Sequence, residues 1–251
     1  IYTKAFDLRG FGKNKNSGLW FPLNVHMKDI KNELFKIKSI YPKKKIFLLG
    51  ESMGGAIVIS LASSDKKLPI DGIVMLAPAI WNFTEKNFLK SYFMNFFSRI
   101  LPNLQVESKG WVDVQASDNI EMLKELAKDK FFIHKPNLRS LYGVITLMDK
   151  SYKNAREFFI DTTYNTLLIV PLRDEIVPRK PLIELLEKIN IKNKLDLLVY
   201  ESSYHMILRD INGYKIANDI KDWMLGNLKK TQSLESRLDL LKNSEFYHIL
   251  D

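Results

Sequence analysis

The amino-acid sequence predicts an α/β fold in which a mostly parallel β-sheet is flanked by helices and interrupted by a helical cap. Short apolar segments alternate with amphipathic segments of helical length, an order typical of a parallel sheet covered on both faces. A glycine-rich corner around Ser52 joins two apolar segments, as expected for a strand, a sharp turn and a buried helix. The 251 residues, 46% of them hydrophobic, suffice for one large core with an insertion.

The first predicted elements are a strand, a loop and a helix. Ile1 to Phe6 is β-prone and alternates between polar and apolar residues. Asp7 to Gly12 contains two glycines, which permit a backbone turn that other residues resist. Val25 to Ile40 repeats apolar residues at helical spacing, and Pro42 ends this pattern.

The remaining core elements are predicted from the same signals. Further strands are expected at Lys45 to Leu49, Ile70 to Leu76, Thr166 to Val170 and Leu195 to Tyr200. Further helices are expected at Ala56 to Ser63, Lys180 to Ile189 and Ile216 to Leu228.

The stretch 81–160 breaks this alternation. It contains helical patterns around Asn119 to Ala127 and Leu138 to Met148. Its first part is rich in aromatic residues, namely Phe83, Phe88, Tyr92, Phe93, Phe96 and Phe97. We therefore divide the chain into a first part of the core at 1–80, a helical cap at 81–160, a second part of the core at 161–230 and a charged tail at 231–251.

The composition excludes several classes of protein. Without cysteine, the chain has no disulfide, no thiolate metal site and no cysteine nucleophile. Its net charge of +9 would favour binding to an acidic partner such as a nucleic acid or an anionic membrane. The lysines are scattered along the chain, however, as is usual for solvent-exposed faces. We therefore expect no nucleic-acid partner and retain only a weak preference for acidic membranes. No apolar run approaches the ~20 residues that span a bilayer, and we predict a cytoplasmic protein.

Residues 50–54, Gly-Glu-Ser-Met-Gly, carry the strongest chemical signal. A serine hydroxyl becomes a good nucleophile only when a neighbouring base takes its proton. Gly50 and Gly54 permit the strained turn that would lift the Ser52 hydroxyl above the sheet, and Gly55 extends that room. The helix that follows would aim its amides at the reacting centre, with the Met53 N–H donating to the oxyanion. Ser52 is therefore the predicted nucleophile.

A base and an orienting acid follow in the order expected for such a site. Asp174 lies in a loop after a predicted strand, where α/β sheets collect functional groups, and the adjacent Glu175 is the alternative acid. His205 comes just after the last predicted strand. The other histidines, His26, His134 and His248, are predicted to be solvated or partly packed.

The motifs around these residues resemble the monoacylglycerol lipase and lysophospholipase group of α/β-hydrolases, also described as serine aminopeptidase S33-like. The resemblance spans most of the chain and rests on four segments, at residues 7–12, 50–55, 71–78 and 174–178. It favours Asp174 over Glu175 as the acid. The fold that it implies is the α/β-hydrolase fold.

The resemblance also implies a reaction. Ser52 would attack a single-chain lipid ester, His205 would serve as base and then acid, Asp174 would hold its tautomer, and water would release the acyl group. The substrate would be a monoacylglycerol or a lysophospholipid, with no metal or organic cofactor. The aromatic cap would form an acyl pocket or touch a membrane, although ordinary helix packing is the commoner role of such aromatic residues.

Two alternatives stay open. The chain could be an inactive or split-gene remnant that keeps a lipid-binding pocket, or an aminopeptidase or small-ester hydrolase of the same fold. An aminopeptidase would favour an acidic group for the substrate amine, and Glu85, Glu107 and Asp118 are the nearby acidic residues.

One departure from the resemblance concerns the start of the chain. Members of the group carry a His-Gly loop after an earlier strand, which supplies a second oxyanion N–H, and no segment here matches it. We therefore expect that N-terminal strands are missing, with a gap between the Ile1 to Phe6 strand and the Lys45 to Leu49 strand. Loss of one oxyanion donor typically lowers turnover by ~100- to 1,000-fold, so we expect weak activity unless such a segment is restored.

Overall fold

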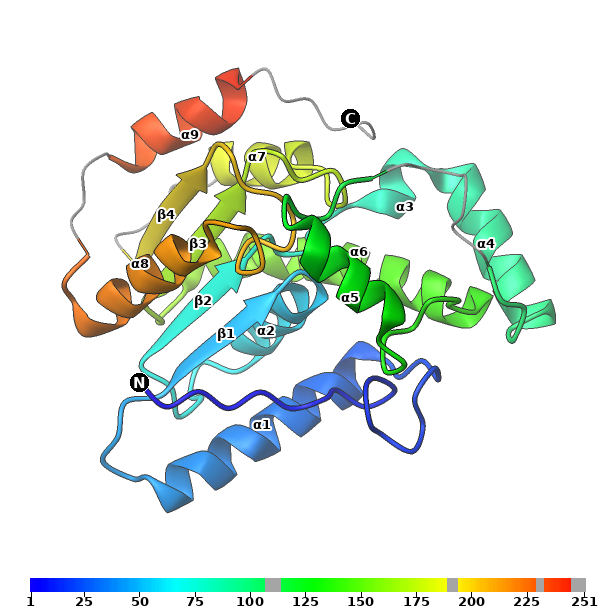
Figure 1. The fold of residues 1–251 in the computed structure, drawn as a ribbon, viewed down its shortest axis with the longest axis horizontal. Coiled ribbons are helices and arrows are strands. Elements are labelled where there is room, and N and C mark those ends of the chain that lie inside the picture. Colours follow the sequence, from blue (N-terminus) through cyan, green and yellow to red (C-terminus); the bar gives the residue numbers. More distant parts are fainter. Residues whose placement is uncertain (107–113, 189–193, 229–232, 245–251) are drawn as a thin grey trace.

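A computed structural model of the chain describes residues 1–106, 114–188, 194–228 and 233–244. Its centre is a parallel sheet in which four strands lie in sequence order (Figure 1). The strands are β1 (Phe47–Glu51), β2 (Gly72–Leu76), β3 (Thr166–Pro171) and β4 (Leu195–Tyr200). All four predicted core strands are confirmed, with β1 and β2 beginning two residues later than expected.

Helices cover both faces of the sheet because the strands are apolar on both faces. On one face, Val74 and Leu76 of β2 pack with α8 (Gly213–Leu225). On the other, Ile73 and Met75 belong to a larger cluster. This cluster includes side chains of α1 (Leu23–Ile40), α2 (Met53–Ser64), α6 (Leu138–Asp161), α7 (Lys180–Glu187) and α9 (Leu234–Asn243).

The segment between β2 and α6 extends to one side of the sheet (Figure 1). Its described residues form α3 (Phe83–Lys86), α4 (Phe88–Ile100) and α5 (Ile120–Lys128). The helix predicted from Leu138 to Met148 runs on to Asp161, because Phe158 and Phe159 continue its buried face into the core. Within the described ranges, no helix combines the length and apolar character needed to cross a membrane.

The predicted strand from Ile1 to Phe6 is wrong. This segment has no regular secondary structure, and Ile1 and Tyr2 are 77% and 84% exposed. Alternation indicates β-propensity, but a strand also needs a partner that completes its hydrogen-bond ladder. Instead, an ion pair of Lys4 with Glu33 joins the segment to α1, and β1 is an edge strand of the described sheet.

The charged tail packs on the core within its described part. Helix α9 places Leu241 in the main cluster, and the buried Arg237 donates a hydrogen bond to the backbone carbonyl of Leu197 in β4. At the end of the preceding helix, Gly226 adopts a φ of 78°, which ends α8 at Leu225 rather than at the predicted Leu228.

Candidate active site

Ser52 occupies the one residue between β1 and α2, in a strained backbone conformation. Its φ and ψ are 52° and −118°, values that cost a non-glycine residue of order 1–3 kcal/mol. Backbone hydrogen bonds of 2.9 Å hold the turn, from Ser52 N to the carbonyl of Leu76 and from Ala79 N to the carbonyl of Ser52. The strain is therefore imposed by the sheet and helix on either side.

Gly50 makes this turn possible. A Cβ at Gly50 would lie 2.5 Å from the carbonyl oxygen of Gly54, closer than real atoms approach. At Gly55 a Cβ would lie 2.8 Å from the Cβ of Pro78. Gly54 differs, since nothing lies within 4 Å of a Cβ there. Packing thus requires glycine at 50, where the strand meets α2, and at 55, where α2 meets Pro78 of the loop after β2, but not at 54.

Asp174 lies in the loop after β3 and faces His205. Its Oδ1 accepts hydrogen bonds from the backbone N–H groups of Ile176 (2.8 Å) and Val177 (2.9 Å), which fix the carboxylate. Its Oδ2 lies 2.7 Å from His205 Nδ1. The alternative acid, Glu175, points elsewhere and accepts a 2.7 Å hydrogen bond from the backbone N–H of Gln115.

His205, in the loop after β4, joins the acid to the serine. Its Nε2 lies 2.9 Å from Ser52 Oγ, and His205 as a whole is only 6% exposed. With Nδ1 protonated and donating to Asp174, the Nε2 lone pair faces the serine hydroxyl. The structure thus brings together Ser52, Asp174 and His205 in the geometry of a nucleophile, a base and an orienting acid.

Residues 115–117, in the segment between β2 and α6, hold the two loops in place. The backbone N–H of Met206 donates to the carbonyl of Ala116 (2.8 Å). Buried Asp210 accepts from Ser117 Oγ (2.7 Å) and from the backbone N–H of Tyr204 (2.8 Å). Burial raises the pKa of the Asp210 carboxyl, while these hydrogen bonds oppose that shift. Sequence reasoning missed Ser117 and Asp210, for which the only signal is a carboxylate five residues after His205.

Glu51 adds a second carboxyl beside the site. Burial raises its pKa, and electrostatic interactions with His205 and Arg209 act in the opposite direction. Its Oε1 is buried and has no hydrogen-bond partner within the described residues. The Glu51 carboxyl beside Ser52 therefore accepts a proton more readily than an exposed glutamate does.

The other candidates from the sequence do not join this site. His26 is fully buried on α1, His134 is exposed, and His248 lies outside the described residues. Glu85 accepts a hydrogen bond from Asn82, and Asp118 accepts one from the backbone N–H of Ile211. Glu107 also lies outside the described residues.

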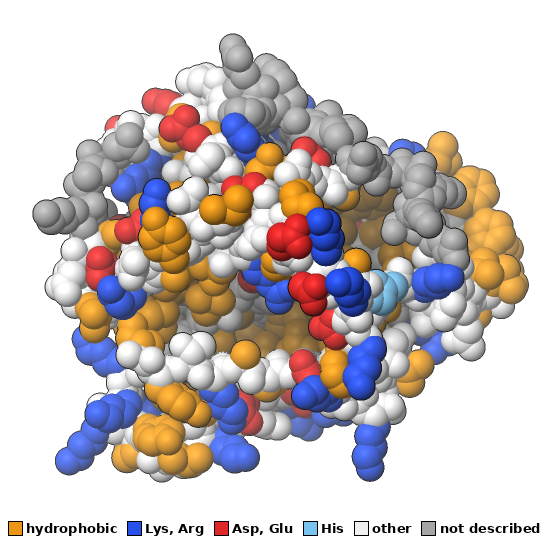
Figure 2. Space-filling model, viewed as in Figure 1, with side chains coloured by type: hydrophobic (Ala, Val, Ile, Leu, Met, Phe, Trp, Pro, Cys, Tyr) orange, Lys and Arg blue, Asp and Glu red, His pale blue; other side chains and the backbone are white. Residues whose placement is uncertain are grey.

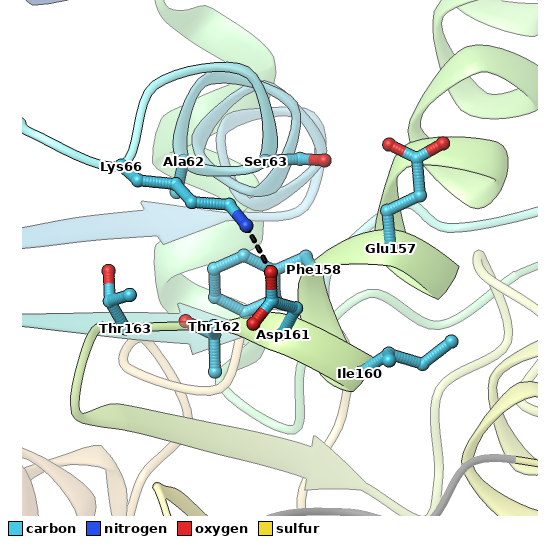
Figure 3. A pocket seen from close by; sticks show the side chains of 9 residues that line it. All are labelled: Ala62, Ser63, Lys66, Glu157, Phe158, Ile160, Asp161, Thr162 and Thr163. Atoms are coloured by element: carbon cyan, nitrogen blue, oxygen red, sulfur yellow. Dashed lines mark hydrogen bonds and ion pairs between the residues drawn. The ribbon is translucent and has the colours of Figure 1, made fainter.

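A surface cavity of about 320 Å³ lies elsewhere on the molecule (Figure 3). It is lined by the carboxyl ends of α2 and α6, and an ion pair of Lys66 with Asp161 crosses it. Ser52 lies at the opposite end of the 12-residue α2, about 18 Å along the helix axis at 1.5 Å per residue. This cavity is therefore not part of the candidate active site.

The parallel sheet, the strained turn at Ser52 and the three aligned side chains define a serine hydrolase of the α/β-hydrolase class. A family model described as serine aminopeptidase, S33 (Hydrolase_4) matches residues 1–212. The chain belongs to this family.

Comparison with individual proteins points the same way. The chain is 24% identical over 224 residues to the monoglyceride lipase of Mus musculus, covering 88% of this chain and 72% of that protein. It resembles the crystal structure of a monoacylglycerol lipase from Paleococcus ferrophilus with a TM-score of 0.70 at 22% identity, covering 89% and 82% of the two chains. For a soluble variant of monoglyceride lipase from Saccharomyces cerevisiae, the TM-score is 0.71 at 18% identity, covering 89% and 77%. The likeness to the two solved structures shows the shared fold.

Proposed function

We propose that the protein hydrolyses single-chain lipid esters, either monoacylglycerols or lysophospholipids, through an acyl-enzyme. The observation that carries the proposal is the continuous hydrogen-bonded path from Ser52 Oγ through His205 to Asp174, with distances of 2.9 and 2.7 Å. The similarity to monoglyceride lipases supports the substrate class. We also propose that the protein contacts a membrane surface peripherally and that it is cytoplasmic.

The reaction follows from the roles of the three side chains. His205 Nε2 takes the hydroxyl proton as Ser52 Oγ bonds to the ester carbonyl carbon. Asp174 keeps the proton on Nδ1 and stabilises the imidazolium, while the Met53 N–H, at the positive end of α2, donates to the oxyanion. The alcohol leaves with the proton from His205, and a water activated by His205 then cleaves the acyl-Ser52 ester. No second oxyanion donor is assigned among the described residues.

Covalent labelling with a fluorophosphonate probe tests the nucleophile. We expect the wild-type protein to be labelled and Ser52→Ala to be unlabelled, because the probe forms a bond with an activated serine oxygen. Ser60→Ala is the matched control, since Ser60 is buried on the same helix and donates only to the carbonyl of Ala56. Labelling that persists in Ser52→Ala would contradict the assignment.

The substrate class is tested by turnover. Release of glycerol from a long-chain monoacylglycerol and release of fatty acid from a lysophospholipid should both exceed hydrolysis of an aminoacyl amide. Labelling without turnover of any ester would instead support the reading of the chain as an inactive remnant. Preferential hydrolysis of the aminoacyl amide would support an aminopeptidase.

A further inference from the structure

Residues 115–119, just before α5, are each joined by a hydrogen bond to one of the two loops that carry the acid and the base. We call them the 115–119 segment. The backbone N–H of Gln115 donates to Glu175 at 2.7 Å. The carbonyl of Ala116 accepts from the backbone N–H of Met206 at 2.8 Å. Since Glu175 and Met206 directly follow the acid and the base in the sequence, the segment contacts both loops next to the reacting groups.

The rest of the segment bonds to the loop after β4 through side chains. These bonds run from Ser117 Oγ to Asp210 (2.7 Å), from the Ile211 N–H to Asp118 Oδ1 (2.8 Å) and from Asn119 Nδ2 to the Arg209 carbonyl (3.2 Å). Ser117 and Asp210 are both buried, so water does not compete for the bond between them.

Asp210 connects the segment to the base. One of its carboxylate oxygens accepts from Ser117, and the other accepts from the backbone N–H of Tyr204 at 2.8 Å. Tyr204 is covalently bonded to His205, so loss of this acceptor releases the backbone immediately before the imidazole. His205 Nε2 lies 2.9 Å from Ser52 Oγ, and a displacement of about 1 Å between reacting groups can lower a rate by ~10²-fold.

Helix α5 follows the segment directly but does not fix it by apolar burial. Asn119 Oδ1 accepts from the backbone N–H of Met122 and so caps the helix. None of the residues of α5 is buried, and Figure 2 shows acidic and basic side chains over it. The place of the 115–119 segment against the two loops therefore depends on its hydrogen bonds.

We propose that Asp210 is a positioning residue for His205 and that the 115–119 segment, through Ser117, holds Asp210 in place. Asp210 does not contact the substrate in this role. It fixes the backbone at Tyr204, which keeps His205 Nε2 directed at the hydroxyl of Ser52. The inference rests on the proposed function, because it assigns what His205 requires to act as the base in that reaction.

Kinetics of single variants of the full chain test the role of Asp210. Asp210→Ala should slow fluorophosphonate labelling, and lower kcat for a soluble ester, by at least about tenfold with KM within about twofold, because the base and not the substrate is displaced. Asp210→Asn keeps an oxygen that can accept from the Tyr204 N–H and should recover most of this loss. Unchanged labelling in Asp210→Ala, or an equal loss in Asp210→Asn, would overturn the proposal.

Ser117→Ala tests the link to the 115–119 segment. It leaves the bond between Asp210 and Tyr204 and should slow labelling less than Asp210→Ala does, by about threefold or more. Ser98→Ala is the matched control, because Ser98 is also buried between β2 and α6 but donates to the carbonyl of Asn95 within α4. It should be labelled like the wild-type protein.

Hydrogen–deuterium exchange separates this inference from the proposed function, because it needs no turnover. Ser117→Ala and Asp210→Ala should speed exchange in the peptide 203–211, while the peptide of β3 keeps its wild-type rate and so verifies the fold. Unchanged exchange at 203–211 in both variants would overturn the proposal, whether or not the wild type hydrolyses an ester. So would equally faster exchange in β3, which would indicate only a general loss of stability. Labelling of Ser52 in the wild type reports separately on the proposed function.

Discussion

At the residue scale, the two adjacent acids after β3 have different tasks. Asp174 contacts His205, whereas Glu175 accepts from the backbone of the cap at Gln115. The sequence favoured Asp174 only through the family resemblance. Sequence spacing alone cannot distinguish two adjacent acidic residues in the same loop. The direction of each side chain depends on backbone contacts that form between distant segments.

This division predicts unequal effects of matched substitutions. Asp174→Asn should lower kcat by about 10²- to 10⁴-fold, because the amide favours the wrong tautomer of His205. Glu175→Gln keeps an oxygen that can accept from the Gln115 N–H and should leave kcat nearly unchanged, because this side chain contacts the Gln115 backbone whereas Asp174 contacts His205. Steady-state hydrolysis of a soluble ester measures both. A larger loss of kcat in Glu175→Gln than in Asp174→Asn would show that Glu175, and not Asp174, orients His205.

His26 is the second residue with a measurable consequence. Its ring is fully buried and lies near Trp20 and Phe11. Neither ring nitrogen makes a hydrogen bond of normal geometry within the described part of the chain, although the Phe21 backbone is close enough to favour the charged form. Burial, the largest influence, lowers the pKa of His26, with the charge of Asp29 opposing that shift.

Stability should therefore depend on pH through His26. Below about pH 6.5 the unfolded chain binds a proton at this residue that the folded chain does not, so the free energy of unfolding falls as the pH decreases. Urea unfolding between pH 5 and 8 should show this decline in the wild type and a shallower one in His26→Gln. The exposed His134→Gln is the control and should follow the wild type. Identical slopes in all three proteins would rule out this role for His26.

At the scale of elements, the turn between β1 and α2 links local sequence to chemistry. The glycines around Ser52 indicate a sharp turn, but they do not reveal which of them is sterically required. That distinction comes from packing between the strand and the helix, since Gly50 faces the backbone of Gly54 while Gly54 itself faces open space.

Alanine substitutions at these two glycines should have unequal effects on stability. Gly50→Ala should lower the melting temperature strongly and abolish probe labelling, because the added methyl group meets fixed backbone. Gly54→Ala should leave stability unchanged or raise it by up to about 1 kcal/mol, since alanine favours the helix. Thermal unfolding compares the two. Similar destabilisation by both would contradict the steric argument.

At the scale of the whole molecule, periodicity predicted the four core strands and their helices because buried strands and amphipathic helices follow from burial alone. It failed at Ile1 to Phe6, where strand formation depends on a partner rather than on the segment itself. It also did not indicate that the aromatic residues of α4 face outward. Apolar residues at helical spacing lie on one face of a helix, but the spacing does not tell whether that face is buried or exposed. The contacts of Asp210 and Ser117 were likewise invisible, since they join residues 93 positions apart.

The sequential order of the four strands has a consequence for how the chain acquires its chemistry. Each strand pairs with the one synthesised before it, so the sheet can grow in one direction as the chain emerges from the ribosome. Ser52 precedes His205 by 153 residues, and His205 follows β4, the strand at the far edge of the described sheet. During synthesis Ser52 therefore has no His205 beside it until the last described strand has been made.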